Sequence, residues 1–232
     1  MSENPTSADL EAGLAVARDG DPVDAIVAVG GGSAMDCAKG INFLLTNGGE
    51  IEDYWGFGKA DKPMLPSIGI PTTAGTGSEA QSFALISQAD THVKMACGDR
   101  KARFRTVILD PELIGSAPTS VKAAAGYDAV AHAVESYVCT KANAVSRMYA
   151  REAFRLLDAS LLPFVEGKPG AEAGDVLLGA HFAGMAIEAS MLGAAHGCAN
   201  PLTAKYGMTH GVAVALMLPS VVGFNARGDR HL

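Results

Sequence analysis

A strand, a glycine-rich turn and a helix follow one another within residues 24–45, and this pattern constrains the fold more than any other feature of the chain. The run DAIVAV, Asp24 to Val29, is continuous and rich in β-branched residues, as in a parallel sheet covered on both faces. Three glycines at positions 30–32 then permit a tight turn, Ser33 is a candidate N-cap, and Ala34 to Leu45 has a helical pattern. The chain is therefore predicted to begin as an α/β protein.

A second segment of the same kind follows at Ser67 to Glu79. Its sequence, SIGIPTTAGTGSE, begins as a short apolar strand and runs into a loop of threonine, glycine and serine residues. Farther on, Phe83 to Ile86 and Lys94 to Cys97 flank a polar segment, which predicts a β-hairpin. The run TVIL, Thr106 to Leu109, has the character of another buried strand. These strands extend the α/β pattern.

The second half of the chain has a different character. After Asp110, alanine-rich segments with a 3.6-residue apolar period replace the strand patterns, which predicts helices throughout. We place the boundary near Leu113 to Pro118. The sequence thus predicts a Rossmann-like α/β domain with a parallel sheet over residues 1–114 and an all-helical domain over residues 115–232.

Charge and hydropathy exclude two classes of partner. The formal net charge is -7, whereas nonspecific binding to nucleic acid requires clustered Lys and Arg, and no such cluster is visible. Uncharged apolar runs such as Val176 to Ile187 fall short of the ~20 residues that cross a bilayer, and the polar N-terminus has no signal-peptide core. We therefore expect a cytoplasmic protein that binds neither nucleic acid nor a membrane.

Two polar side chains stand in the small, apolar helix sequence GYDAVAHAVESY. Asp128 and His132 are four residues apart, so a helix places both on one face and lets them reach one point beside it. A carboxylate oxygen and an imidazole nitrogen are half of a metal site. On its own, however, such a pair is more often a surface ion pair.

Two further histidines have similar apolar, small-residue surroundings. His196 lies in a helix that Asn200 and Pro201 are expected to end, and His210 opens the next helix behind Thr209, a candidate N-cap. A single histidine of this sort is usually a hydrogen-bonded core residue. Three of them with an aspartate, all on helices of one domain, favour a shared metal.

Several motifs together identify a family. The segments GGGSAMDCAK, PTTAGTGSE, DPEL, GYDAVAHAVESY and GAAHGCANPL with THG resemble, in order and spacing, the iron-containing (group III) alcohol dehydrogenases. The resemblance runs from about Asp24 to the C-terminus, and the combination is highly specific although each motif alone is not. It implies an α/β nucleotide-binding domain followed by a helical metal domain.

The resemblance also implies a catalytic metal held by one aspartate and three histidines. Carried onto this sequence, these ligands are Asp128, His132, His196 and His210. The implied metal is Fe2+, with Zn2+ as the alternative because the order of metal affinities favours zinc for such ligands. The metal would coordinate the substrate oxygen and stabilise the alkoxide from which hydride passes to NAD or NADP. The expected reaction is oxidation of a small-molecule alcohol or reduction of an aldehyde, and a homo-oligomer is left open.

The glycine turn is the expected site of the cofactor diphosphate. Backbone amides of Gly31, Gly32 and Ser33 at a helix N-terminus would bind it, although many such turns are only tight connections. For Lys94 the resemblance implies a contact near the nicotinamide ribose, where the alternative is a solvated hairpin lysine. Asp36 accompanies the loop in the family but could simply complement the helix N-terminus. Further cofactor contacts are implied for Thr72, Thr73 and Thr76.

The sequence departs from the family pattern in two ways. Many relatives have a further histidine four residues after the third ligand, where it could relay a proton, and here that position is Asn200, which cannot titrate. The family also has further elements before the glycine turn and after the last ligand. We therefore expect an internal fragment or a truncated member in which both domains are partial.

Two alternatives to a dehydrogenase remain at this stage. A related dehydroquinate-synthase-like lyase would use a metal and NAD on the same architecture, but the PTTAGTGSE loop and the spacing around His196 argue against it. The other alternative is a non-catalytic truncated remnant that binds nucleotide or metal without turnover.

Overall fold

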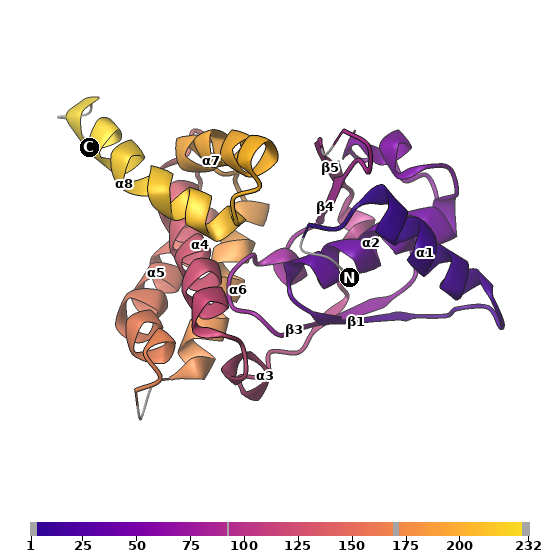
Figure 1. Ribbon diagram of the computed structural model, residues 1–232, viewed down its shortest axis with the longest axis horizontal. Helices are drawn as coiled ribbons and strands as arrows, with labels where there is room; N and C mark the ends of the chain where they lie inside the picture. Colours follow the sequence, from indigo (N-terminus) through magenta and orange to yellow (C-terminus); the bar gives the residue numbers. More distant parts are fainter. Residues whose placement is uncertain (1–3, 92, 169–171, 229–232) are drawn as a thin grey trace. The chain divides into compact units, whose positions relative to one another are not determined.

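Two compact units make up the chain (Figure 1). The computed structural model describes residues 4–91, 93–168 and 172–228. We call residues 1–72 with 78–113 the α/β unit, and residues 73–77 with 114–232 the helical unit. The predicted fold class, a parallel sheet with helices followed by an all-helical part, is confirmed.

The α/β unit contains two small sheets. In the first, β1 (Ile26–Gly30), β3 (Ser67–Pro71) and β6 (Thr106–Val107) are parallel, in the order β1-β3-β6. In the second, β5 (Lys94–Gly98) lies between β2 (Gly56–Phe57), which is parallel to it, and β4 (Phe83–Ser87), which is antiparallel. The helices of this unit are α1 (Ser7–Arg18), α2 (Gly32–Asn47) and short 3-10 helices at Ile51–Tyr54, Ser78–Ala80 and Arg100–Ala102.

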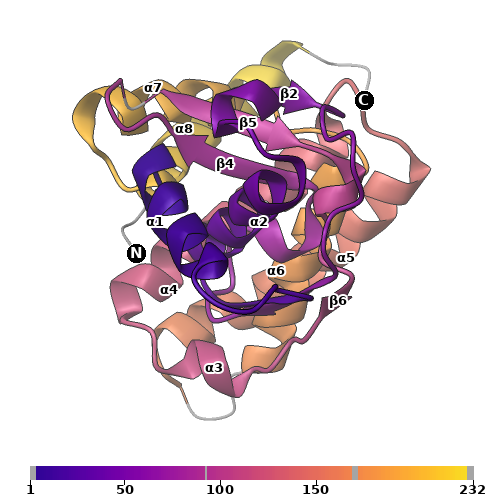
Figure 2. The same ribbon diagram turned by 90° about the vertical axis from the view of Figure 1, so that its right-hand side faces the viewer.

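Helix α2 is the central element of the α/β unit. It packs against α1, β1 and β4 (Figures 1 and 2). Met35 of α2 contacts Ala28 of β1 and Phe104 in a small core cluster. On the opposite face of the strand, however, the side chains of Val27 and Val29 are 58% and 57% exposed. The expectation that this strand is covered on both faces is not met within the described residues, because alternate side chains point to opposite faces and α2 packs on only one.

The two strands predicted at residues 83–86 and 94–97 are present in the structure with nearly the expected bounds. β4 and β5 form the predicted hairpin, with Phe83 paired to Gly98 and Ser87 to Lys94. Position 92, in the turn, lies outside the described residues. The strand predicted at residues 106–109 is shorter than expected, since β6 ends at Val107.

The helical unit contains α4 (Thr119–Val138), α5 (Ala144–Val165), α6 (Ala173–Glu188), α7 (Ala194–Tyr206) and α8 (His210–Gly228); the short α3 (Glu112–Gly115) precedes them. α4 packs against α5, α6 and α8, and α7 packs against α8 (Figure 1). Small residues allow this close packing: a Cβ at Gly126 of α4 would lie 2.2 Å from a side-chain carbon of Leu161. None of the described helices is long and apolar enough to cross a membrane.

Helix α7 does not end where the sequence indicated. It begins at Ala194 and continues through Pro201 to Tyr206, whereas Asn200 and Pro201 were expected to stop it. A proline inside a helix removes one hydrogen bond and costs about 3 kcal/mol. Burial of Ala195 and Ala199 against α8, with Leu202 packed beside them, supplies the compensating contacts. Tertiary packing thus outweighs the local preference.

The loop at residues 73–77 belongs to the helical unit, although the predicted boundary placed it in the first domain. A Cβ at Gly75 would lie 2.6 Å from the backbone oxygen of Ala125 in α4. Gly77 has φ +61, and a Cβ there would lie 2.6 Å from the Cα of Gly184 in α6. The two glycines therefore let this loop lie directly against the backbones of two helices.

We expect Gly75→Ala to destabilise the helical unit. The added methyl group meets the backbone of α4, which cannot move aside as a flexible side chain could, so the cost is about 1–3 kcal/mol. Urea unfolding followed by far-UV circular dichroism measures the change. Gly223→Ala in α8 is the matched control, because open space surrounds that position and alanine is expected to stabilise the helix by up to about 1 kcal/mol. An unchanged unfolding midpoint for Gly75→Ala would contradict this packing.

Candidate metal centre

Two polar side chains on one face of α4 form the base of the candidate site. Asp128 and His132 are 3% and 4% exposed, and Asp128 Oδ1 lies 3.4 Å from His132 Nε2. The alternative of a surface ion pair is therefore excluded by burial. Ala129, Ala131 and Ala133 in the same turns of α4 are also buried, so neighbouring elements pack closely around this part of the helix.

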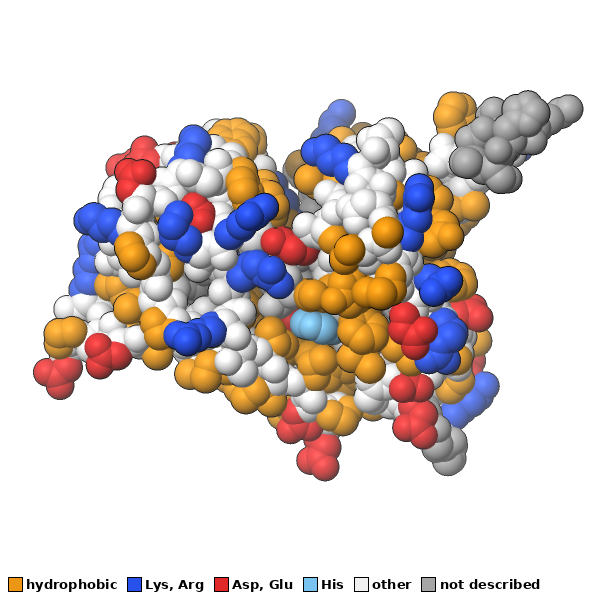
Figure 3. All heavy atoms as spheres, turned by 180° about the vertical axis from the view of Figure 1, so that it is seen from behind, with side chains coloured by type: hydrophobic (Ala, Val, Ile, Leu, Met, Phe, Trp, Pro, Cys, Tyr) orange, Lys and Arg blue, Asp and Glu red, His pale blue; other side chains and the backbone are white. Residues whose placement is uncertain are grey.

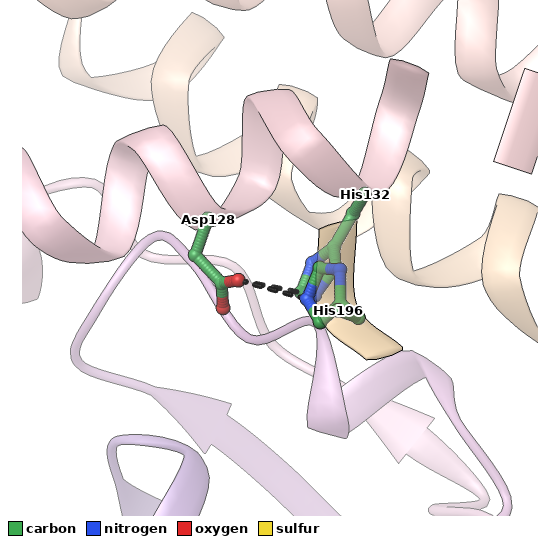
Figure 4. A group of neighbouring side chains, drawn as sticks. All are labelled: Asp128, His132 and His196. Carbon is green, nitrogen blue, oxygen red and sulfur yellow. Dashed lines mark hydrogen bonds and ion pairs between the residues drawn. The ribbon is translucent and has the colours of Figure 1, made fainter. Parts of the chain in front are cut away.

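The other two predicted ligands come from α7 and α8. His196 lies in the first turn of α7 and is buried, and its Nε2 is 3.2 Å from Asp128 Oδ1 (Figure 4). His210 is the first residue of α8, as predicted, and its Nε2 is 3.7 Å from the same oxygen. Its side chain keeps 24% exposure. The structure thus brings the three imidazoles to one oxygen of Asp128, with His210 on the accessible side.

The donor set fits a divalent cation. Asp128, His132 and His196 each offer one donor atom within 4.8 Å of the others. Four donors at about 2.1 Å from a tetrahedral metal are separated from one another by about 3.4 Å. The three oxygen-to-nitrogen distances, 3.2, 3.4 and 3.7 Å, lie on either side of that value. One carboxylate and imidazole nitrogens also suit Fe(II) and Zn(II).

The electrostatics of the cluster favour a positive charge at its centre. Burial alone would raise the pKa of Asp128, but the imidazoles of His132, His196 and His210 hold it well below its usual range. Burial lowers the pKa of His132 to about 4, so this imidazole is neutral at physiological pH. Burial would also lower the pKa of His196, but its hydrogen bonds to Asp128 and Glu135 raise it to about 9. The protonated His196 ring therefore carries one hydrogen toward each buried carboxylate, from Nδ1 to Glu135 and from Nε2 to Asp128, and a cation could take the place of the second.

Glu135 is a site residue that the sequence did not single out. It is 3% exposed, and its Oε2 lies 2.5 Å from His196 Nδ1. The signal was present: Asp128, His132 and Glu135 are spaced i, i+4 and i+7, which places all three on one stripe of a helix. A glutamate at that spacing is equally consistent with a solvated residue at the polar edge of the helix. Only the structure shows that Glu135 is buried and contacts His196.

The glycine turn takes the conformation expected of an anion-binding helix start. β1 ends at Gly30, and Gly31 is the N-cap of α2, with φ -78 and ψ -171. The first amides to bond within the helix are those of Ala34 and Met35, both to the oxygen of Gly31. The amides of Gly32 and Ser33 precede them and belong to the first turn, where helix amides lack intrahelical partners. These two amides are the ones available to a diphosphate.

The structure places Asp36 in a buried network rather than on the loop surface. Its carboxylate accepts a hydrogen bond from the Ser78 hydroxyl and lies 3.7 Å from Lys39 Nζ. Lys39 in turn donates to the backbone oxygens of Ser78 and Phe83, at 2.7 and 2.6 Å. Burial raises the pKa of Asp36. The network joins α2 to residues 78–83, so these contacts favour a structural role for Asp36.

The remaining cofactor candidates lie in the loop after β3 and in the hairpin. The Thr72 amide donates to the backbone oxygen of Gly30 at 2.8 Å, which links this loop to the glycine turn. Lys94 begins β5, and its Nζ lies 3.2 Å from Asn4 Oδ1, while the Asn4 amide donates to Ser33 Oγ. Lys94 is therefore tied to the glycine turn through Asn4. Thr73 and Thr76 belong to the loop of the helical unit.

Comparison with known proteins gives consistent matches along the chain. A family model described as iron-containing alcohol dehydrogenase matches residues 1–111, and one described as the C-terminal part of the Fe-containing alcohol dehydrogenase family matches residues 122–231. Alcohol dehydrogenase 4 of Schizosaccharomyces pombe is 42% identical over 99% of this chain and 54% of its own length. The NAD-dependent methanol dehydrogenase of Bacillus methanolicus is 35% identical over 96% of this chain and 58% of its own length.

Solved structures agree with this result. A 1,3-propanediol oxidoreductase matches with a TM-score of 0.93 and 35% identity, over 98% of this chain and 60% of its own. Sulfoacetaldehyde reductase from Bifidobacterium kashiwanohense, solved in complex with NAD+, matches with a TM-score of 0.86 and 30% identity, over 97% of this chain and 60% of its own. The chain thus spans a little more than half the length of the relatives it matches.

Proposed function

Because the chain belongs to the iron-containing alcohol dehydrogenase family, we propose that it takes part in metal-dependent, NAD(P)-linked oxidation of alcohols or reduction of aldehydes. The observation that carries this proposal is the approach of three imidazole nitrogens to one buried carboxylate oxygen, at 3.2 to 3.7 Å. A structural core would not need three histidines around one aspartate.

In this proposal Asp128, His132, His196 and His210 hold the metal. A bound divalent cation acts as a Lewis acid toward the oxygen of an alcohol or aldehyde and lowers the pKa of an alcohol. The three buried ligands close the site on one side, and partly exposed His210 lies on the side from which a substrate can approach. We propose iron as the metal because of the family, with zinc as the alternative on ligand chemistry.

The α/β unit binds the nicotinamide cofactor in this proposal. The amides of Gly32 and Ser33 receive the diphosphate at the N-terminus of α2, where the helix dipole favours negative charge. Gly31, which carries no side chain, lets the diphosphate approach the backbone. Thr72, which follows β3 in the same unit, and Lys94 are proposed as further contacts. Support comes from two relatives, one named as NAD-dependent and one solved with NAD+.

Asn200 affects the route by which a proton leaves. It is exposed and lies in α7 one turn after His196. Its amide cannot take up a proton, so ordered water or a cofactor hydroxyl is proposed to carry the proton in place of a side chain.

The test is turnover by the whole chain after metal loading. The metal-free protein is loaded with Fe(II) without oxygen, or with Zn(II), and mixed with NAD+ or NADP+ and short primary alcohols or diols. We expect formation of reduced nicotinamide, seen by its absorbance, that requires added metal and is lost with a chelator. Protein that binds both metal and NAD(P)+ yet forms no reduced nicotinamide with these alcohols, and oxidises none with the matching aldehydes, would refute the proposal.

A further inference from the structure

We propose that Glu135 is a positioning residue that keeps the hydrogen of His196 on Nδ1 and fixes the orientation of the ring, so that Nε2, beside Asp128, is the nitrogen available to a metal. The proposal rests on the metal site proposed above. Glu135 does not approach the metal-facing nitrogen itself. It contacts the opposite nitrogen of the ring, Nδ1.

The tautomer follows from the chemistry of the carboxylate. The backbone amides of Ala195 and His196 both donate to the oxygens of the Glu135 carboxylate, and donors of this kind favour its ionised form. An ionised carboxylate only accepts hydrogen bonds. His196 Nδ1, 2.5 Å away, must therefore carry the hydrogen. The other ring nitrogen, Nε2, which lies 3.2 Å from Asp128 Oδ1, is then the one that can donate a lone pair to a metal.

The orientation follows from a second set of contacts made by the same carboxylate. α7 has Gly193 as its N-cap, which has no side chain to cap the helix. Glu135, from α4, takes this role: its Oε1 accepts from the Ala195 amide at 2.6 Å and its Oε2 from the His196 amide at 3.4 Å. A Cβ at Gly193 would lie 2.8 Å from Glu135 Oε1, so glycine leaves room for the carboxylate. One side chain thus fixes both the backbone and the ring of His196.

His132 provides an internal comparison. Its Nδ1 is buried and has no hydrogen-bond partner among the described residues, whereas the Nδ1 of His196 is bound to Glu135. Both rings present Nε2 to Asp128. The control of tautomer by a carboxylate is therefore a property of His196 and not of every imidazole in the cluster.

Glu135→Gln separates the two roles of this side chain. The glutamine oxygen can still accept from the Ala195 amide and keep α7 capped. Its NH2 group would then face His196 Nδ1 and donate to it, which moves the ring hydrogen to Nε2 and removes the lone pair from the site. We expect affinity for Zn(II) and Co(II), measured by competition with a chromophoric chelator, to fall about 10- to 100-fold. The visible absorption of bound Co(II) should also change, while the far-UV circular dichroism of the metal-free protein stays the same.

Glu152→Gln on α5 is the control, because the Glu152 side chain is partly exposed and pairs with Arg155 on the same helix. It should leave metal affinity and the Co(II) spectrum unchanged. Wild-type affinity and an unchanged Co(II) spectrum in Glu135→Gln would overturn the inference. If the wild-type chain itself bound neither metal, the proposed function would fail instead.

A second measurement needs no variant and decides the matter if Glu135→Gln does not fold. Long-range proton–nitrogen NMR of the wild-type, zinc-loaded chain with 15N-labelled histidine reports which nitrogen of each ring carries hydrogen. We expect one histidine with a strongly deshielded Nδ1 proton that does not exchange rapidly with solvent, assigned to His196 by its loss in His196→Gln. A hydrogen on Nε2 of His196 would refute the proposal.

Discussion

Replacement of Asp128 by asparagine is expected to abolish metal binding and, with it, turnover. Asp128 Oδ1 lies within 3.7 Å of Nε2 on each of three histidines. It is therefore the atom around which the other three candidate ligands are arranged. Asparagine keeps the size but removes the negative charge that balances a cation. Groups that only support a metal ligand already contribute about 10- to 100-fold to affinity, so loss of this ligand should weaken binding by more than about 100-fold.

Elemental analysis of the purified variant and chelator competition measure this loss directly, without an activity assay. Asp158→Asn on α5 is the matched control, because Asp158 is exposed and outside the cluster. It should bind metal as the wild-type chain does. Stoichiometric metal of unchanged affinity in Asp128→Asn would mean that the four residues do not form the proposed site.

Gly31→Val is expected to weaken cofactor binding about 100-fold while leaving the α/β unit folded. The backbone at Gly31 has φ -78 and ψ -171, an extended conformation that valine adopts without strain. The new side chain would, however, stand where the diphosphate approaches the amides of the first turn of α2. Loss of two charge-assisted hydrogen bonds, at about 1.5 kcal/mol each, corresponds to about 100-fold weaker binding.

The enhancement of NADH or NADPH fluorescence on binding measures this affinity, and circular dichroism reports the fold. Gly174→Val is the control, because Gly174 also lies in the first turn of a helix, with nothing within 4 Å of a Cβ there. Cofactor affinity should be unchanged in that variant. Equal affinity in Gly31→Val and the wild-type chain would mean that the glycine turn is only a tight connection.

The apolar surface of the helical unit was only partly foreseeable. Phe224 and Leu216 of α8 are 78% and 60% exposed, and hydrophobic side chains gather on the face of this unit seen in Figure 3. The alanine-rich, periodic sequence predicted the helices themselves. It did not predict which of their faces would stay exposed, because burial depends on which neighbouring helix is present.

Several elements of the fold have a local cause and could be predicted from short stretches of the chain. A continuous β-branched run, the glycines at 30–32 and a 3.6-residue apolar period predicted β1, α2 and the change to an all-helical second half. Spacing of four residues placed Asp128 and His132 together, because a helix turns once in 3.6 residues whatever surrounds it. Apolar, small-residue surroundings made His196 and His210 candidates, and the family resemblance assigned them as ligands, although no local pattern joins them to Asp128.

The contacts between segments distant in the chain depend on how the helices pack. His196 lies 68 residues from Asp128, yet their donor atoms are 3.2 Å apart, because α7 and α8 pack with α4 through small side chains. The same packing carries α7 through Pro201, draws residues 73–77 onto α4 and α6, and turns Glu135 into the cap of a helix it does not belong to. Periodicity fixes which face of an element a residue occupies. The partner of that face is set by side-chain volumes and close contacts between elements, which a single local pattern does not contain.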